Sequence, residues 1–206
     1  MKNPCLILSM MITCFITACN PKNCEDVPPY FDIKNLNLEI KKIAEIYADQ
    51  SFSTTSFDLN NLIAYNEIVL EITPQFSYYG NVKPFNFKDL FINTAYAGKC
   101  PEPGHKGSTA HISKIAIFSN QPFTDSNSIQ DDLSTYFKIS GLNQHFGAIK
   151  QLEIPSFLST KPDLMRVIQL TMKENPTVNK EHEFTIIYEQ SNGKTFELIT
   201  PLIKFE

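Results

Sequence analysis

The chain has 206 residues and a formal net charge of −4, with 18 lysines and arginines against 22 aspartates and glutamates. Its length is sufficient to bury a hydrophobic core without a structural metal. The mildly acidic balance, without a basic stripe, argues against nucleic acid as a partner. Beyond the N-terminal region, no apolar run approaches the about 20 residues that a membrane-spanning helix needs.

Residues 1–18 have the pattern of an export signal that is removed after use. Lys2 supplies the positive charge, and an apolar run over residues 6–16 follows it. This run is too short to cross a bilayer as a helix, so we interpret it as a processed segment rather than as part of the fold. It ends in Ile16-Thr17-Ala18-Cys19, which resembles the lipobox of bacterial lipoprotein signal peptides. The alternatives are ordinary secretory cleavage nearby and a buried helix of a cytosolic protein.

The resemblance to a lipobox implies a location. A peptidase would cut before Cys19 and the thiol of Cys19 would carry lipid, so the implied partner is a membrane. Asn20 stands where an aspartate retains well-studied lipoproteins in the inner membrane. The resemblance therefore implies the outer membrane, with the periplasmic or surface face left open. The predicted organisation is a signal peptide over 1–18, a lipidated tether over 19–29 and one domain over 30–206.

The five cysteines separate into three groups. Cys5 and Cys14 leave with the signal peptide, Cys19 carries lipid, and Cys24 and Cys100 remain in a compartment that favours oxidation. We predict a Cys24–Cys100 disulfide, which contributes about 4 kcal/mol in the chain-entropy model for so long a loop. The alternative is two unpaired thiols. Intact-mass analysis is expected to show a gain of two hydrogen atoms on reduction, and an unchanged mass would refute the bridge.

The predicted elements after the tether are mostly strands, in which apolar and polar residues alternate with a period of two. This alternation predicts strands over 36–41, 68–73, 115–118, 167–172 and 184–189, with a return strand from 196. Residues 43–47 extend the first strand or begin a helical turn. We expect a polar loop over 51–56, a turn over 78–81, and a loop over 99–107 that is rich in proline and glycine.

Three local signals complete this outline. Pro74 is expected to end the second strand or to lie at a sheet edge. Ser128 and Asp131 have the spacing of a capping box, and the apolar residues that follow, up to Phe137, predict a short helix. Asn192-Gly193 predicts a tight hairpin, because both residues tolerate positive φ.

These elements predict a mainly β fold: a β-sandwich of immunoglobulin-like architecture with one or two short helices. Many short strands with turn signals between them are typical of this class. The chain has no tryptophan, so the tryptophan and disulfide pin of antibody domains is absent. The likeness is therefore one of architecture only.

The sequence combines several features along its length. They are the lipobox, Cys24, the early alternating strand, the Asn-Gly hairpin, and the segments AYAGKC (95–100), IAIFS (115–119) and DDL (131–133). In this combination the chain resembles small uncharacterised lipoproteins of the Bacteroidota, whose domain has no assigned function. The resemblance implies the location and a β-rich fold, and it carries over no catalytic residue.

No arrangement of residues in the sequence predicts catalysis, a metal or a cofactor. The four histidines match no zinc-binding spacing and are each expected at the surface or in a loop; they are His105, His111, His145 and His182. The acidic stretch 125–132 lacks the glycine and the bidentate glutamate of an EF-hand. No phosphate-binding loop, dinucleotide fingerprint or serine-hydrolase elbow occurs.

Three functional hypotheses follow. The first is a non-enzymatic, lipid-anchored module of the cell envelope that binds a glycan or an envelope protein, or has a structural role. The second is a glycan-binding accessory lipoprotein of an outer-membrane uptake system, in which Tyr78 and Tyr79 form a stacking surface. It requires these two rings to be exposed and coplanar, and packing or turn formation is the competing interpretation. The third is a hydrolase whose residues converge only in the fold.

Overall fold

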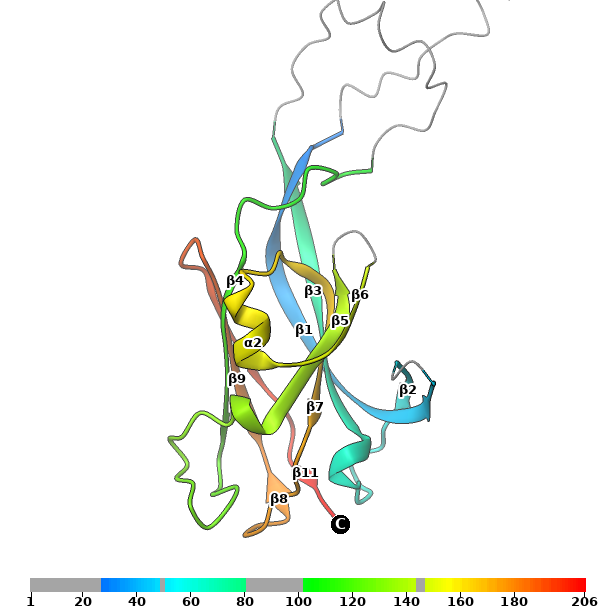
Figure 1. Cartoon of the computed structure of the whole chain (residues 1–206), viewed down its shortest axis with the longest axis vertical. Helices are drawn as coiled ribbons and strands as arrows, with labels where there is room; N and C mark the ends of the chain where they lie inside the picture. Colours follow the sequence, from blue (N-terminus) through cyan, green and yellow to red (C-terminus); the bar gives the residue numbers. More distant parts are fainter. Residues whose placement is uncertain (1–26, 49–50, 81–101, 144–146) are drawn as a thin grey trace, which may run out of the picture. The chain divides into compact units, whose positions relative to one another are not determined.

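The computed structural model describes residues 27–48, 51–80, 102–143 and 147–206, and these residues form a mainly β fold (Figure 1). A six-stranded sheet has the order β2-β1-β3-β7-β5-β6, a three-stranded sheet the order β10-β9-β4, and β11 pairs with β8. The strands are β1 (Tyr30–Ile46), β2 (Phe52–Ser56), β3 (Ile68–Tyr79), β4 (Ile112–Ser119), β5 (Phe137–Asn143), β6 (Ala148–Glu153), β7 (Met165–Met172), β8 (Glu181–His182), β9 (Phe184–Gln190), β10 (Thr195–Ile199) and β11 (Ile203–Lys204). The helical elements are the 3-10 turns η2 (Tyr65–Glu67) and η4 (Ser134–Tyr136) and the helix α2 (Ile154–Ser159).

The chain divides into two compact units, with boundaries inside β1 and β3. The smaller unit comprises Met1–Phe31 and Tyr78–Lys106. In its described part, the N–H groups of Gly104 and Lys106 donate to the carbonyls of Pro28 and Pro29, each at 2.8 Å. The larger unit comprises Asp32–Ser77 and Gly107–Glu206, and it holds the hydrophobic core.

The core of the larger unit lies between the six-stranded and the three-stranded sheets. Strand alternation places Leu70, Leu170 and Ile139 on one face of the six-stranded sheet, because they are register partners across β3, β7 and β5. Phe137 lies on this same face, and its ring meets Phe184 of the three-stranded sheet edge to face at 5.6 Å. All five side chains are essentially fully buried. The two sheets therefore pack face to face, as in a sandwich.

The mainly β prediction is confirmed, and every strand predicted from alternation is present. The hairpin prediction is also confirmed. Gln190 N–H donates to the Lys194 carbonyl at 2.9 Å, and Gly193 has φ +86°. Residues 43–46 continue β1, which settles the choice between strand and helical turn in favour of the strand.

Two segments expected to be irregular are strands. Residues 52–56, within the expected polar loop, form β2, in which Ser56 pairs with Lys41 of β1. Tyr78 and Tyr79, expected in a turn, end β3. The strand continues through Pro74 because its pairing with β7 ends at Ile72. The missing N–H of the proline therefore removes no bond on that side.

The short helix predicted after Ser128 is reduced to one 3-10 turn, η4. The capping-box bond forms, because Ser128 N–H donates to Asp131 Oδ2 at 2.7 Å. No α-helix follows, since the Asp132 carboxylate accepts bonds from the N–H groups of Ile117 in β4, at 3.1 Å, and Ser134, at 2.9 Å. Among the described residues of the larger unit, the α-helix is α2, which begins with a proline in its first turn. Among the described residues, no helix combines the length and the apolar character needed to cross a bilayer.

Candidate ligand-binding site

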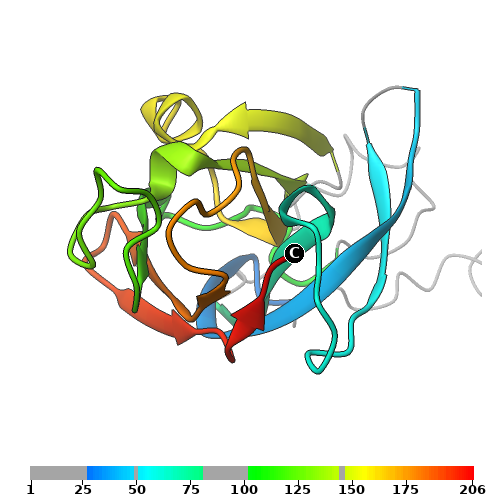
Figure 2. The same ribbon diagram turned by 90° about the horizontal axis from the view of Figure 1, so that it is seen from below.

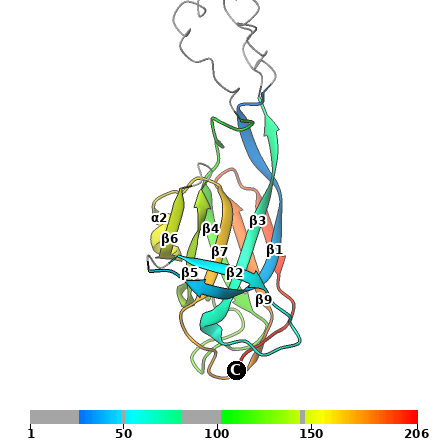
Figure 3. The same cartoon turned by 90° about the vertical axis from the view of Figure 1, so that its right-hand side faces the viewer.

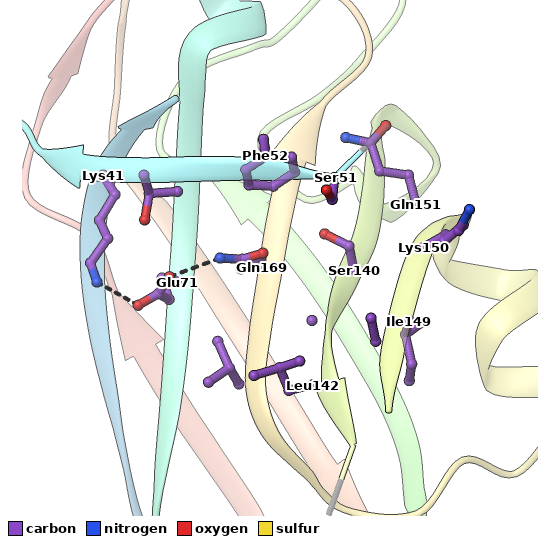
Figure 4. A pocket seen from close by; sticks show the side chains of 14 residues that line it. Lys41, Ser51, Phe52, Glu71, Ser140, Leu142, Ile149, Lys150, Gln151 and Gln169 are labelled. Atoms are coloured by element: carbon purple, nitrogen blue, oxygen red, sulfur yellow. Dashed lines mark hydrogen bonds and ion pairs between the residues drawn. The ribbon is translucent and has the colours of Figure 1, made fainter. Parts of the chain in front are cut away.

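A row of polar side chains crosses the six-stranded sheet on the face opposite to the core. Glu71 of β3 pairs with Gln169 of β7, and Gln169 pairs with Ser140 of β5. Each of these residues is one position away from a core residue, so its side chain points to the other face. Figure 4 shows the three side chains side by side with Lys41 of β1.

Glu71 organises this row. Lys41 Nζ donates to Glu71 Oε1 at 2.5 Å, and Gln169 Nε2 donates to Glu71 Oε2 at 2.9 Å (Figure 4). Glu71 is only 9% exposed, so its charge requires these partners. The hydrogen bond to Glu71 raises the pKa of Lys41, and Glu39 at 3.4 Å adds to the effect. Lys41 and Glu71 therefore form a compensated ion pair.

The hydrogen bond to Glu71 also fixes the orientation of the Gln169 amide. A carboxylate only accepts hydrogen bonds, so the amide nitrogen must face Glu71. Gln169 Oε1 then points away from Glu71 and accepts no hydrogen bond from the described residues. It is left as an acceptor for another group.

The sheet face and β2 enclose a pocket of about 490 Å³. β2 returns across the sheet and faces β5 and β6 over this space (Figures 2 and 3). The lining residues are Lys41, Ser51, Phe52, Thr54, Glu71, Ser140, Gly141, Leu142, Ala148, Ile149, Lys150, Gln151, Val167 and Gln169. The volume lies within the range of about 300–1,000 Å³ that small-molecule sites occupy.

Ser140 has an unusual position in this pocket. The residue is 6% exposed, and its Oγ has no hydrogen-bond partner among the described residues. Figure 4 shows the hydroxyl directed toward Gln169. Buried hydroxyls are normally paired, because an unpaired one costs about 1–3 kcal/mol. The pocket floor therefore combines an unpartnered hydroxyl with an amide oxygen that is also unused.

Gly141 positions the wall beside Ser140. It has φ +145°, and a Cβ built at this position would lie 2.0 Å from the backbone oxygen of Val167. The register between β5 and β6 also shifts between Ile139 and Gly141. Only a residue without Cβ allows β5 to approach β7 so closely here. The pocket geometry thus depends on this glycine.

The two tyrosines predicted as ligand contacts do not line the pocket. Tyr78 is 44% exposed and Tyr79 is 42% exposed. As consecutive strand residues they point to opposite faces of β3. Tyr79 stacks on Tyr30 at 5.9 Å, and Tyr78 meets Phe31 edge to face at 6.5 Å. The rings are exposed but do not share one plane, and their role as ligand contacts stays a prediction.

The predicted cysteine sites, Cys19, Cys24 and Cys100, lie outside the described residues, as does His145. His105 is exposed in a turn, as predicted. His182 is different, because it is fully buried rather than at the surface or in a loop. The prediction for this histidine is wrong, since the aromatic rings of Phe123, Phe184 and Phe205 cover it.

His182 makes two hydrogen bonds in the core. Its Nε2 lies 3.0 Å from the carbonyl oxygen of Asn179, and its Nδ1 lies 2.8 Å from Ser119 Oγ. The carbonyl can only accept, so Nε2 carries the proton and Ser119 donates to Nδ1. Burial lowers the pKa of His182, while the Asn179 carbonyl opposes this shift. The ring stacks on Phe184 at 5.7 Å, and Ser119 is 6% exposed, which favours a structural role for the pair.

No three histidine, cysteine, aspartate or glutamate side chains of the described residues converge as metal ligands. No protein-family model, no curated protein and no solved structure matches the chain.

Proposed function

We propose that the protein is a lipid-anchored binding module of the cell envelope, which holds a small ligand in the pocket between β2 and the six-stranded sheet. Two observations support the two halves of this proposal. Ile16-Thr17-Ala18-Cys19 supplies the anchor. The unpartnered Ser140 hydroxyl, beside the unused oxygen of Gln169, supplies the binding site.

The unpartnered hydroxyl of Ser140 is the observation that most directly supports binding. This enclosed hydroxyl destabilises the free protein unless a partner is supplied, by about 1–3 kcal/mol. A well-packed sheet face has no need of such a group, because alanine or valine would fill the position without this cost. A ligand that draws the Ser140 side chain into the pocket and pairs with its hydroxyl removes the penalty. The site is therefore arranged for an occupant.

The lining supports binding rather than catalysis. General acid–base chemistry needs titratable groups that are free to exchange protons. Among the described lining residues, Glu71 is the one carboxylate, and both of its oxygens are engaged by Lys41 and Gln169. No histidine contributes to this lining, and the amine of Lys150 points away from the pocket floor (Figure 4). The arrangement is suited to recognition.

We expect a library of small polar fragments to bind in the pocket of the unlipidated full chain, the Cys19→Ser variant. Amide shifts in ¹H–¹⁵N NMR spectra should cluster at Ser140, Lys150 and Gln169. The Ser140→Leu variant fills the pocket from its floor and should abolish these shifts. Shifts that are scattered over the surface and unchanged by Ser140→Leu would refute the site.

The anchor is tested separately in cells. Metabolic labelling with an alkyne analogue of palmitate should mark the wild-type chain, which should fractionate with membranes. Cys19→Ala should lose both the label and the membrane association. Cys14→Ala is the matched control, because it changes a cysteine within the apolar run and should leave both intact. Labelling that survives Cys19→Ala would rule out the lipobox.

A further inference from the structure

We propose that the ligand of this pocket is a saccharide, and that neighbouring hydroxyls of one sugar ring bridge Gln169 Oε1 and Ser140 Oγ. This inference rests on the proposed function, because it identifies the ligand class of the same pocket. It differs from the stacking surface predicted at Tyr78 and Tyr79, since it places recognition in the polar row of the six-stranded sheet.

The hydrogen-bonding capacity of the floor defines what the ligand must offer. The amide nitrogen of Gln169 is engaged by Glu71, so the floor presents Gln169 Oε1, which only accepts. Ser140 Oγ beside it is closed to solvent in the free chain, so a ligand contact requires rotation about χ1 that turns the hydroxyl into the pocket, where it can donate and accept. A ligand must therefore bring at least one donor, together with a second group that pairs with a hydroxyl. A sugar hydroxyl both donates and accepts, so two adjacent hydroxyls satisfy both positions.

The spacing of the two floor groups suits such a pair. Gln169 and Ser140 are register partners across β7 and β5. Side chains at paired positions have Cβ atoms about 4.5–5.5 Å apart, so their polar ends can reach adjacent atoms of one ligand. Ion pairing with Lys41 and hydrogen bonding to Gln169 hold Glu71 in place, which keeps the acceptor oriented. The floor is thus preorganised for a two-point contact.

The remaining lining fits a neutral ligand with polar edges and apolar faces. The other polar side chains are mostly uncharged hydroxyls and amides, as in Thr54 and Gln151. The charge of Lys41 is compensated by Glu71, and the amine of Lys150 points away from the pocket floor (Figure 4). The half-buried ring of Phe52 and the side chain of Leu142 add apolar surface. Sugar rings present hydroxyls at their edge and C–H groups on their faces, and such faces pack on aromatic rings.

The test is calorimetric titration of the Cys19→Ser chain with disaccharides of the common hexoses, pentoses and N-acetylhexosamines. We expect at least one disaccharide to bind, and we expect Gln169→Ala and Ser140→Ala each to weaken its binding about tenfold. Ser156→Ala is the matched control, because Ser156 is exposed on α2, and it should leave binding unchanged. Ser140→Ala should also raise the melting temperature of the free chain by about 2–4 °C. A merely structural serine would not combine a gain in stability with a loss of affinity.

The outcomes separate this inference from the proposed function. If no disaccharide binds, while dipeptides or other small fragments bind in a manner that Ser140→Leu abolishes, the saccharide is refuted and the binding module stands. If saccharide binding is insensitive to both Ser140→Ala and Gln169→Ala, the two-point contact is refuted. If no fragment of any class occupies the pocket, the inference and the proposed function fall together.

Discussion

Replacing Gly141 with alanine is expected to lower the free energy of unfolding by about 2–6 kcal/mol. Two effects add at this position. A left-handed or otherwise unusual backbone conformation costs an ordinary residue about 1–3 kcal/mol, and φ at Gly141 is +145°. The added Cβ would also lie 2.0 Å from the backbone oxygen of Val167, and backbone cannot move aside as a flexible side chain does. Overpacking of this kind typically costs a further 1–3 kcal/mol or so.

The matched control for this substitution is Gly193→Ala. Gly193 also has positive φ, at +86°, but a Cβ there meets nothing within 4 Å. Gly193→Ala should lower the free energy of unfolding only by the cost of the left-handed backbone conformation, about 1–2 kcal/mol. Urea unfolding of the two variants and the wild-type chain provides the comparison. Equal losses in the two variants would show that the close approach of β5 to β7 is not what requires the glycine.

The same substitution should also disturb the pocket. Gly141 and its neighbour Ser140 both line the pocket. If Val167 must retreat from a new Cβ, β5 shifts relative to β7, and the Ser140 hydroxyl moves away from Gln169. We therefore expect Gly141→Ala to lose ligand binding even at temperatures at which the chain is folded. Gly193→Ala should bind as the wild-type chain does.

The strands could be predicted from the sequence to the extent that burial alternates along them. β9 buries one face, so its apolar residues recur with a period of two. β3 and β7 also bury residues of the second face, which makes parts of these strands nearly continuous apolar runs. β2 could not be predicted in this way. It contains serines and threonines, and its conformation depends on pairing with β1 rather than on its own preference. The short helix α2 is six residues long, too short for a helical period to show.

The candidate site could not be predicted from the sequence, for a related reason. Glu71 and Gln169 are the polar half of two alternating strands, the pattern of a solvent-exposed face. What makes them a site is the curvature of the sheet and the return of β2 across it, which bring together residues as distant in the sequence as Lys41 and Gln169. The lone acidic residue in the middle of the apolar strand β3 was the one available signal. A carboxylate flanked by buried residues on both sides needs a partner.

Replacing His182 with alanine is the second change with a large expected effect, a loss of about 3–5 kcal/mol in the free energy of unfolding. The ring is fully buried among Phe123, Phe184 and Phe205, so its removal leaves a cavity comparable to that of a truncated core aromatic. The substitution also leaves the Ser119 hydroxyl and the Asn179 carbonyl without their partner.

His182→Gln separates the hydrogen bonds from the charge. The glutamine amide oxygen can accept from Ser119, and its nitrogen can donate to the Asn179 carbonyl, as the neutral imidazole does. We expect His182→Gln to lose clearly less stability than His182→Ala in urea unfolding near neutral pH. Equal losses would mean that cavity formation alone determines the effect and that the two hydrogen bonds contribute little.

The pH dependence of stability should identify His182 as a buried neutral histidine. Burial lowers its pKa in the folded chain below the ordinary value of 6.5, whereas in the unfolded chain it titrates near that value. Between these two pKa values the unfolded state binds more protons, so stability rises with pH. The stability that the folded chain gains from keeping His182 neutral is therefore complete above pH 6.5, and it is lost as the pH falls from there through the lowered pKa. No charged side chain contributes to this shift, so salt should change it little.

Urea unfolding from about pH 8 to about pH 4 tests this dependence. The wild-type chain should lose stability more steeply on the acid side than His182→Gln does. His105→Gln is the control, because it changes an exposed histidine, and it should follow the wild type. Carboxylates titrate in all three chains, so the difference between them isolates the imidazole, and parallel curves would show that its protonation is not linked to folding.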